Sequence, residues 1–319
     1  MVLAVAELET RTTVIVVTWR GRDHIGECLD ALATQRRPHR TLVVNNASDD
    51  GTAEVLAHHP SRPHVLRLDH NVGYAGGIAA ALPEVDTPFV AWLNDDAVPA
   101  PDWLDTVEGA LDDDPRLAAA GSVLTLPDGR VQSAGVRLTA DGHGADIPTE
   151  TESDTAFGFC GGAVLLRRHA LEAVGEVPAD FFCYYEDTDT AWRLRLAGWE
   201  IRTVPAARVR HRHGASARLG STHFHLWNER NRLRTLLRCA PAGVAARELA
   251  RFVAITVALP IRRRMGRQVP DTPNFRTSLR LRVLAEVLAG LPATLVARRE
   301  IRRRSTAGRS DVWRRWSGR

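Results

Sequence analysis

Short apolar runs alternate with polar loops over the first hundred residues of the chain. Four of these runs are too short for helices and predict buried strands: Thr13–Thr18, Thr41–Val44, Val65–Leu68 and Pro88–Leu93. Apolar residues at helical spacing predict three helices between them: Asp23–Thr34, Asp50–His58 and Ile78–Leu82. A repeat of strand, polar loop and helix is typical of a mostly parallel sheet flanked by helices. The sequence therefore predicts an α/β fold.

Polar loops follow three of these strands, at Asn45–Thr52, Asn71–Gly77 and Asn94–Ala97. In parallel α/β sheets, ligands bind at the carboxyl ends of the strands, so the three loops are expected to share one site. The acids of Asn94-Asp95-Asp96 provide the hard oxygen ligands that suit Mg²⁺ or Mn²⁺ beside a phosphate. The glycines of the second loop could bring the backbone close to a phosphate or sugar. Ordinary polar turns are the alternative for both loops.

Later segments continue the α/β pattern. We expect a helix at 103–112, a strand at 117–126, a strand with a Gly-Gly kink at Phe157–Arg167 and a strand at Ile201–Arg212. The polar, glycine-rich segment 127–156 is expected to be mobile. His211 ends the last strand, where a neutral imidazole could bind a metal.

Three carboxylates lie within four positions of the stretch Phe181–Trp199: Glu186, Asp187 and Asp189. They precede a helical pattern in which Arg193 and Arg195 lie off the apolar side. A carboxylate at such a junction could act as a general base if a substrate hydroxyl reaches it. The alternative is that the acids cap the helix and interact with its dipole.

Composition indicates a folded protein and its expected cellular location. The apolar fraction of 44% is enough for a large core, and the 4 Cys form no CxxC pair, so a reduced cytoplasmic location is expected. The first residues, MVLAVAELETR, lack the basic start and long apolar core of a signal peptide. No apolar run approaches the ~18 residues that a membrane-spanning helix needs.

Charge is distributed unevenly between two predicted parts of the chain. Residues 241–319 contain 18 Arg against 5 acidic residues, whereas residues 1–240 contain 24 Arg against 33 acidic residues. The basic part shows amphipathic helical patterns and ends in Trp313 and Trp316. Such helices with interfacial tryptophans fit a peripheral anchor on an anionic membrane, and packing against the first domain is the alternative. Nucleic-acid binding is disfavoured, because no recognised nucleic-acid module accompanies the charge.

Several motifs, taken in order, resemble those of the family-2 glycosyltransferases of GT-A fold, particularly bacterial rhamnosyltransferase-like members. The matching segments span about residues 12–240 and read TVIVVTW, VVNNASDDGT, NVGYAGG, LNDDA, GFCGGAVLLRR, FFCYYEDTDTAWRLRLAGW and VRHRHGAS. The resemblance implies a GT-A catalytic domain over 1–240, followed by a basic helical extension over 241–319. It also implies transfer of a sugar from a nucleoside diphosphate to an acceptor hydroxyl, with inversion. Rhamnose carried by dTDP is the first candidate, and UDP- and GDP-sugars remain open.

The resemblance also implies roles for individual residues. Asp187 resembles the catalytic base, with Glu186 beside it, while Asp96 and His211 resemble the ligands of a divalent metal, Mg²⁺ or Mn²⁺. The remaining matched positions are expected at the nucleotide sugar: Thr18, Asn45, Asn71, Gly73, Gly76, Asn94 and Asp95.

Two positions depart from the family pattern. Asn45 stands where Asp is usual, and Ile78 stands where Asn is often found. The amide oxygen of Asn45 can still accept a hydrogen bond from a base, but it carries no charge, so base selectivity is open.

The predicted function is therefore an inverting, metal-dependent glycosyltransferase of cell-envelope glycan synthesis. Its acceptor would be a glycan or a lipid-linked glycan, reached from the cytoplasm or from the inner face of the cell membrane. A sugar-nucleotide nucleotidyltransferase is one alternative. A non-catalytic protein that binds membrane or nucleic acid is the other.

Overall fold

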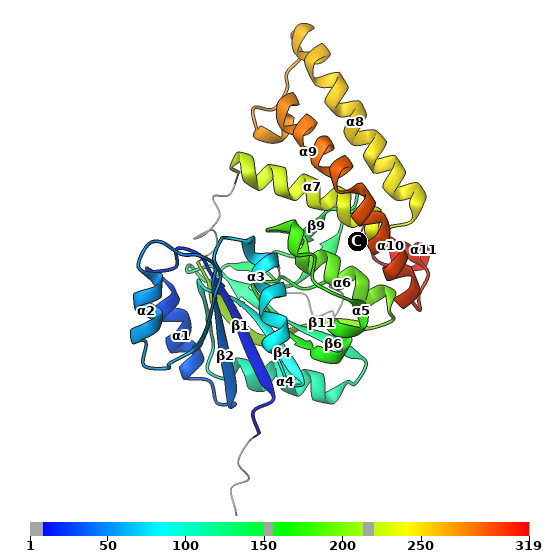
Figure 1. Cartoon of the computed structure of the whole chain (residues 1–319). Coiled ribbons are helices and arrows are strands. Elements are labelled where there is room, and N and C mark those ends of the chain that lie inside the picture. Colours follow the sequence, from blue (N-terminus) through cyan, green and yellow to red (C-terminus); the bar gives the residue numbers. More distant parts are fainter. Residues whose placement is uncertain (1–8, 150–155, 213–219, 319) are drawn as a thin grey trace, which may run out of the picture.

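The computed structural model describes residues 9–149, 156–212 and 220–318. Residues 1–8 of the N-terminal stretch, the stretch 150–155 and the second half of the VRHRHGAS motif lie outside this part. Within it, a nine-stranded sheet has the order β3-β2-β1-β4-β10-β6-β11-β5, with β7 paired to β6 (Figure 1). Its strands are β1 (Thr12–Thr18), β2 (His39–Asn45), β3 (His64–Arg67), β4 (Phe89–Asn94), β5 (Ala97–Pro99), β6 (Leu117–Thr125), β7 (Val131–Ser133), β10 (Ala163–Arg167) and β11 (Glu200–His211). The predicted α/β class is confirmed.

Strand register brings the polar loops to one edge of the sheet. β1 runs parallel to β2 and β4, so that Thr18 pairs with Asn45 and Val17 pairs with Asn94. β10 is antiparallel to β4, and the Asn94 N–H donates to the Gly162 carbonyl at 3.0 Å. The Gly-Gly turn before β10 therefore lies against the carboxyl end of β4.

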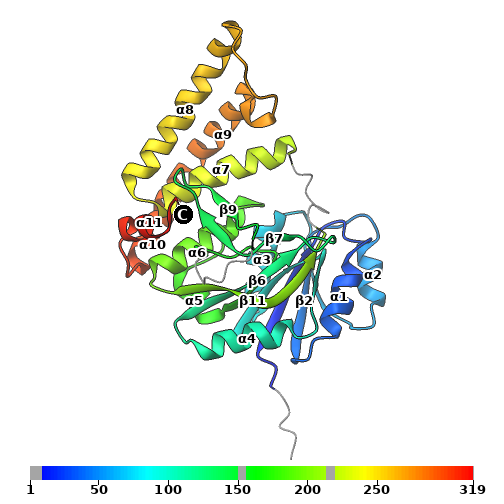
Figure 2. The ribbon, with the colours of Figure 1, turned by 180° about the vertical axis from the view of Figure 1, so that it is seen from behind.

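Helices cover both faces of the sheet (Figures 1 and 2). On one face, the apolar side chains of α1 (Ile25–Ala33), α2 (Thr52–His58) and α4 (Trp103–Asp113) form a single buried cluster with the strands. On the other face, α3 (Gly73–Ala81), α5 (Arg168–Val174) and α6 (Glu186–Leu196) contribute to a second cluster. Burial of these apolar faces stabilises the layered arrangement.

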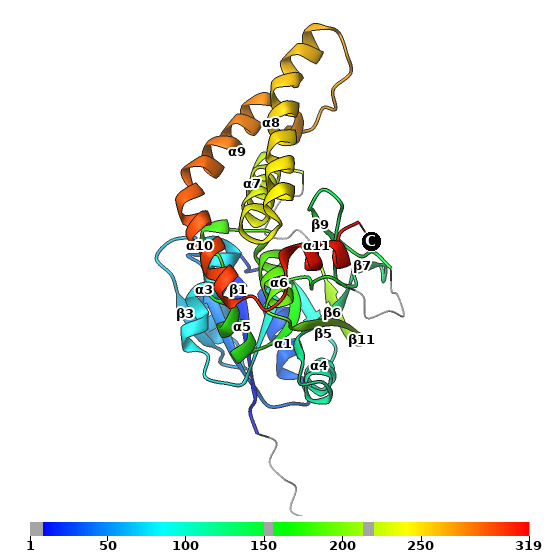
Figure 3. The ribbon, with the colours of Figure 1, turned by 90° about the vertical axis from the view of Figure 1, so that its right-hand side faces the viewer.

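The C-terminal part is helical. Its elements are α7 (Thr222–Cys239), α8 (Ala242–Arg264), α9 (Thr277–Ala289), α10 (Leu291–Arg304) and α11 (Arg309–Trp316), and short 3₁₀ turns occur at Leu82–Glu84, Ala179–Phe181 and Pro273–Phe275. α8 and α9 project away from the sheet (Figure 3). Among the described residues, no helix is both long and apolar enough to cross a bilayer.

The C-terminal helix α11 packs back against the sheet domain. Trp316 packs edge-on against Phe157 at 6.1 Å between ring centroids, and Trp313 stacks on Trp192 at 5.9 Å. The two tryptophans therefore follow the second of the two alternatives, packing against the first domain. Periodicity could not distinguish the two environments, because both present an apolar surface to the ring.

Other predicted elements need correction. The helix expected at Ile78–Leu82 starts at Gly73, so the glycine run forms its first turns. The described part of the segment expected to be mobile contains β7 and a hairpin of β8 (Val136–Leu138) and β9 (Gly144–Asp146). The strand expected at Phe157–Arg167 comprises only Ala163–Arg167. These errors share a cause: small and polar residues gave no periodic signal where tertiary contacts decide the structure.

Candidate active site

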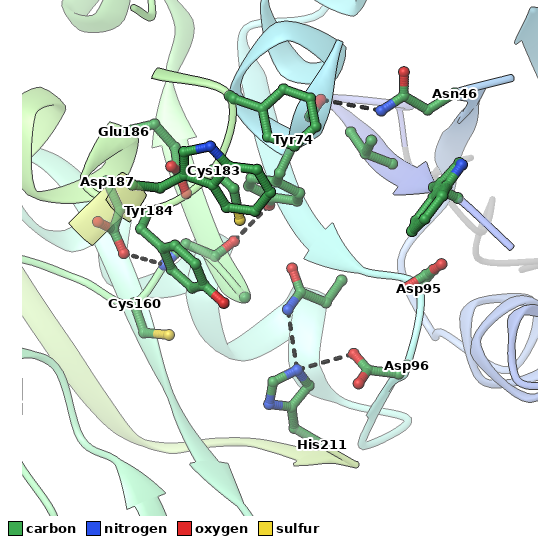
Figure 4. Close-up of a pocket in the computed structure, with 18 of the residues that line it drawn as sticks. Asn46, Tyr74, Asp95, Asp96, Cys160, Cys183, Tyr184, Glu186, Asp187 and His211 are labelled. Atoms are coloured by element: carbon green, nitrogen blue, oxygen red, sulfur yellow. Dashed lines mark hydrogen bonds and ion pairs between the residues drawn. The ribbon is translucent and has the colours of Figure 1, made fainter. Parts of the chain in front are cut away.

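A cavity of about 360 Å³ opens at the carboxyl ends of the central strands. Asp95 and Asp96 line one side of it and Glu186 and Asp187 line the other, although about ninety positions separate the two pairs in the chain (Figure 4). Two acidic motifs predicted to share a site therefore share one cavity.

Asp96 and His211 meet at the base of this cavity. β11 pairs with β5 so that His211 lies opposite Ala97, which places His211 Nε2 2.9 Å from Asp96 Oδ1 and 3.0 Å from Asn94 Nδ2. On the other side of the ring, His211 Nδ1 lies 2.7 Å from Gln132 Oε1. Burial acts to raise the pKa of Asp96, but the hydrogen bond and charge of His211 outweigh it, so this carboxyl stays ionised.

This donor set fits a divalent cation shared with a ligand. With its proton on Nδ1, toward Gln132, His211 could direct the Nε2 lone pair at a cation that replaces the hydrogen bond between Nε2 and Asp96. Within the described residues, no group of three or more His, Cys, Asp or Glu side chains could enclose a metal. Asp96 and His211 would thus provide two protein ligands, and the other coordination positions would be filled by phosphate oxygens and water. That arrangement is typical of Mg²⁺ and Mn²⁺ in nucleotide sites.

Asp95 belongs to a second polar group at the end of β1. Its Oδ2 lies 3.1 Å from His24 Nε2, but neither atom makes an aligned hydrogen bond, and the buried Thr18 Oγ1 has no hydrogen-bond partner either. A Cβ atom on Gly21 would lie 2.1 Å from that Thr18 oxygen and 2.8 Å from the Asp95 oxygen. Buried polar atoms are normally paired, so this group can take up a water or ligand hydroxyl. His24 was not among the residues predicted from the sequence.

The acid pair begins α6 and follows a strained loop. Phe182, Tyr184 and Tyr185 have positive φ angles of 65°, 70° and 72°, which side-chain-bearing residues rarely adopt. Asn231 of α7 donates from its buried amide to the carbonyls of Phe181, Cys183 and Tyr184 at 2.9, 2.9 and 2.8 Å. A side chain nearly fifty residues away thus fixes the loop that positions the acids, and no local sequence signal indicated it.

Glu186 and Asp187 have different partners. Asp187 accepts hydrogen bonds from the N–H of Gly161 at 3.0 Å and from the N–H and hydroxyl of Thr188. Burial raises the pKa of Asp187, and these donors oppose that effect. Glu186 has a buried Oε2 without a hydrogen-bond partner, and burial next to Asp187 raises its pKa to about 8. The three donors favour the ionised form of Asp187, whereas the partnerless oxygen of Glu186 favours a protonated carboxyl there.

The third carboxylate of the cluster has a structural role. Asp189 is fully buried and forms ion pairs with Arg193 at 2.7 Å and with Arg238 of α7 at 2.6 Å. Arg195 is also buried, and it donates to the carbonyls of Ala156 and Phe157. Arg193 and Arg195 were expected off the apolar side of the helix. Both are buried instead, and their hydrogen bonds connect α6 to neighbouring segments.

The other predicted residues divide into two sets. Asn71, Gly73 and Asn94 line the cavity, whereas Thr18, Asn45 and Gly76 do not. The side-chain oxygen of Asn45 accepts from the Ser48 N–H at 3.0 Å, so it supports the turn after β2. The role of these residues at a nucleotide sugar stays a prediction.

Several cavity residues were not identified from the sequence. Asn46 lines the cavity in place of its neighbour Asn45 and donates to Asn71 Oδ1 at 3.0 Å. Tyr74 lines it too, and its hydroxyl donates to the Gly161 carbonyl at 2.7 Å. The aromatic rim of Phe182, Tyr184 and Trp227 includes a contact of 4.6 Å between the ring centroids of Phe182 and Trp227. Asn46 and Tyr74 lie inside the motifs quoted above, but Trp227 comes from α7.

Comparison with known proteins identifies the family. Residues 13–175 match the family described as Glycosyl transferase family 2, which is just over half of the chain. The chain belongs to glycosyl transferase family 2. This membership decides for the glycosyltransferase over the nucleotidyltransferase and non-catalytic alternatives that the sequence left open.

Relatives of this family-2 enzyme act in glycan synthesis. It is 28% identical over 229 residues to the N-acetylglucosaminyl-diphospho-decaprenol L-rhamnosyltransferase of Mycobacterium tuberculosis, a match that covers 62% of this chain and 75% of that protein. It is also 28% identical over 224 residues to the O-antigen biosynthesis protein RfbC of Myxococcus xanthus, covering 64% of this chain and 17% of that protein.

Solved structures share the fold of the family-2 enzyme. A mannosyltransferase of Pyrobaculum calidifontis, solved with GDP-Man and Mn²⁺, aligns with a TM-score of 0.53 at 21% identity over 91% of this chain and 76% of that one. GalNAc-T7, solved with UDP, GalNAc and Mn²⁺, aligns with a TM-score of 0.61 at 12% identity over 90% of this chain and 58% of that one. At these identities the likeness supports the GT-A fold alone.

Proposed function

We propose that this family-2 glycosyltransferase moves a sugar from a nucleoside diphosphate to an acceptor hydroxyl, with inversion and with a divalent metal. The observation that carries the proposal is the single cavity of about 360 Å³ that Asp96 and Asp187 both line. Residues 1–240 would form the catalytic domain and residues 241–319 a basic helical extension.

Asp187 would act as the general base. The acceptor oxygen attacks the anomeric carbon, its proton passes to the Asp187 carboxylate, and the bond to the diphosphate oxygen breaks with its electron pair on the nucleotide. Attack from the side opposite the leaving group inverts the anomeric centre. A divalent cation held by Asp96 and His211 would neutralise charge on the departing diphosphate. Glu186, protonated at neutral pH, keeps a second negative charge away from the base.

Asp95, which lines the cavity with the buried Thr18 and His24 behind it, would hold a hydroxyl of the nucleoside, because its Oδ2 has no aligned hydrogen-bond partner. Asn71, Gly73 and Asn94 would face the diphosphate sugar. The rhamnosyltransferase among the relatives makes rhamnose the first candidate sugar, and the solved structures with GDP-Man and UDP keep other donors open. The acceptor would be a glycan or lipid-linked glycan at the inner face of the cell membrane.

Thermal-shift measurements test donor and metal together. A ligand that binds only the folded state raises apparent stability by about 2.7 kcal/mol at a hundred times its Kd. We expect one of dTDP-rhamnose, UDP-sugars or GDP-sugars to raise the melting temperature, and to raise it more with Mn²⁺. Asp96→Asn should abolish the Mn²⁺-dependent part, whereas Asp113→Asn, an exposed carboxylate outside the cavity, should keep it. A shift that is unchanged in Asp96→Asn would contradict the metal assignment.

A further inference from the structure

Exposed apolar side chains are concentrated in one region of the molecule. Every large apolar residue that is exposed within the described part of the chain lies between Val253 and Val296, on α8, α9, α10 and the turn after α8. Val257, Met265 and Leu288 are 60%, 63% and 63% exposed. Single exposed apolar residues are ordinary, but such a concentration marks an interaction surface.

The α8 residues of this region form a stripe. Val253, Val257, Ile261 and Met265 are spaced four apart, so they lie along one side of the helix and its C-terminal turn. The opposite side of α8, with Phe252, packs against α7 and α9. The stripe therefore faces away from the protein, and α8 and α9 project from the sheet (Figure 3).

A cluster of arginines accompanies the stripe. Arg262, Arg263, Arg264 and Arg267 lie at the end of α8, and no acidic residue occurs between Glu248 and Asp271. Among the described residues, the guanidinium groups of Arg264 and Arg267 have no ion-pair or hydrogen-bond partner, whereas those of many other arginines do. An apolar stripe beside unpaired arginines complements a surface with anionic headgroups above an apolar layer.

The same surface would be a poor contact for a second copy of the chain. Two-fold association through the stripe would place two arginine clusters in one interface to which residues 249–270 contribute no acidic partner, which costs free energy.

The surface is connected to the active-site cavity through α7. Trp227 lines the cavity, and Leu226 and Leu233 of the same helix pack with Phe252 of α8 and Val283 of α9. The helices that carry the exposed stripe are thus built directly on a wall of the cavity.

We propose that the exposed face of α8–α10 docks on an anionic membrane, with the α8 stripe in the acyl boundary and the arginines on lipid phosphates. This inference goes beyond sugar transfer and does not require it. It also differs from an anchor built on Trp313 and Trp316, which are packed against the core.

Vesicle flotation of the full chain tests this surface. The protein should float with vesicles of phosphatidylcholine and phosphatidylglycerol and remain below with phosphatidylcholine alone. Arg264→Glu with Arg267→Glu should lower the partition coefficient at least about thirtyfold, since each basic residue near such a surface contributes about fivefold and the new carboxylates are repelled as well. A matched control, Arg36→Glu with Arg67→Glu, makes the same charge change on exposed residues of the catalytic domain and should float like the wild type.

A second variant tests the apolar contribution. Ile261→Asp with Met265→Asp should also reduce flotation, and its melting temperature should match the wild type because both side chains are exposed. Failure of the wild type to float, or equal loss in the control pair, would overturn the proposal. Sedimentation showing a dimer that Ile261→Asp dissociates would overturn it in favour of a second copy. Donor binding, measured without vesicles, reports separately on the proposed transfer.

Discussion

Glu186 and Asp187 are adjacent in the chain but differ in their surroundings. Three hydrogen-bond donors stabilise the carboxylate of Asp187, whereas Glu186 has a buried oxygen without a partner. The sequence indicated an acid pair at a helix start, but it could not assign the proton. That assignment depends on Gly161, which β10 topology brings from a distant part of the chain.

Glu186 makes stability depend on pH. Burial next to Asp187 raises its pKa from 4.5 to about 8, so across that window the folded state holds a proton that the unfolded chain has released. The free energy of unfolding should therefore fall as pH rises from about 4.5 to about 8, by at most about 1.4 kcal/mol per pH unit. Glu186→Gln should flatten this fall in urea unfolding, whereas exposed Glu176→Gln should not. Equal slopes in wild type and Glu186→Gln would contradict the assignment.

Gly73 is required by a close approach between α3 and the strained loop. Its φ is 75°, and a Cβ atom there would lie 2.1 Å from the Phe182 carbonyl oxygen. Gly73→Ala should displace the loop, lower the melting temperature and weaken donor binding. Gly109→Ala, within α4 and with open space at its Cβ position, should be neutral or stabilising by about 0.5–1 kcal/mol. Similar melting temperatures for the two variants would argue against the close approach.

At the scale of elements, the strands were predictable and the partners of α6 were not. β-branched runs without competing periodicity indicated β1 and β2 within two residues of their ends. Arg193 was expected off the apolar side because charged residues rarely lie inside, yet it is buried by pairing with Asp189. Only the fold, by bringing Arg238 of α7 to the same carboxylate, makes that burial possible.

α7 should control the acid pair through Asn231. Asn231→Asp replaces an amide that donates to three carbonyls with an acceptor that faces them, so the loop Phe181–Tyr185 should relax. At a temperature where the variant is fully folded, we expect the rate of sugar transfer to fall at least about tenfold, with donor affinity retained. Asn228→Asp, one turn earlier on the same helix, serves as the control and should keep its rate. Wild-type turnover in Asn231→Asp would show that the loop is positioned without this amide.

In the C-terminal part of the molecule, some arginine and apolar side chains are buried against the core and others are exposed, and composition could not tell which. The excess of arginine indicated a basic surface, but many arginines pair with buried acids or backbone carbonyls, as Arg280 and Arg298 do. The terminal tryptophans complete the core, and the exposed apolar surface lies on α8–α10 instead. Periodicity correctly predicted amphipathic helices in this part of the chain. It could not predict which face of each helix is exposed to solvent, because tertiary packing decides that.

Removal of the Trp316 ring should destabilise the catalytic domain although it lies three residues from the chain end. The side chain is 8% exposed and packs on Phe157, with Arg195 over its ring at 4.2 Å. Trp316→Ala should lower the free energy of unfolding by about 3 kcal/mol. Arg314→Ala, at an exposed site of the same helix, should change it by less than about 0.5 kcal/mol. Equal unfolding midpoints in denaturant would show that α11 contributes nothing to the core.

We infer that Asp187 receives the acceptor's proton in the cavity that Asp96 also lines. Single-turnover sugar transfer by Asp187→Asn, with donor affinity measured on the same preparation, tests this role. We expect a rate lower by about 10²–10⁴ and an unchanged donor affinity, because the amide cannot accept the proton but fills the same space. A rate close to that of the wild type would contradict it.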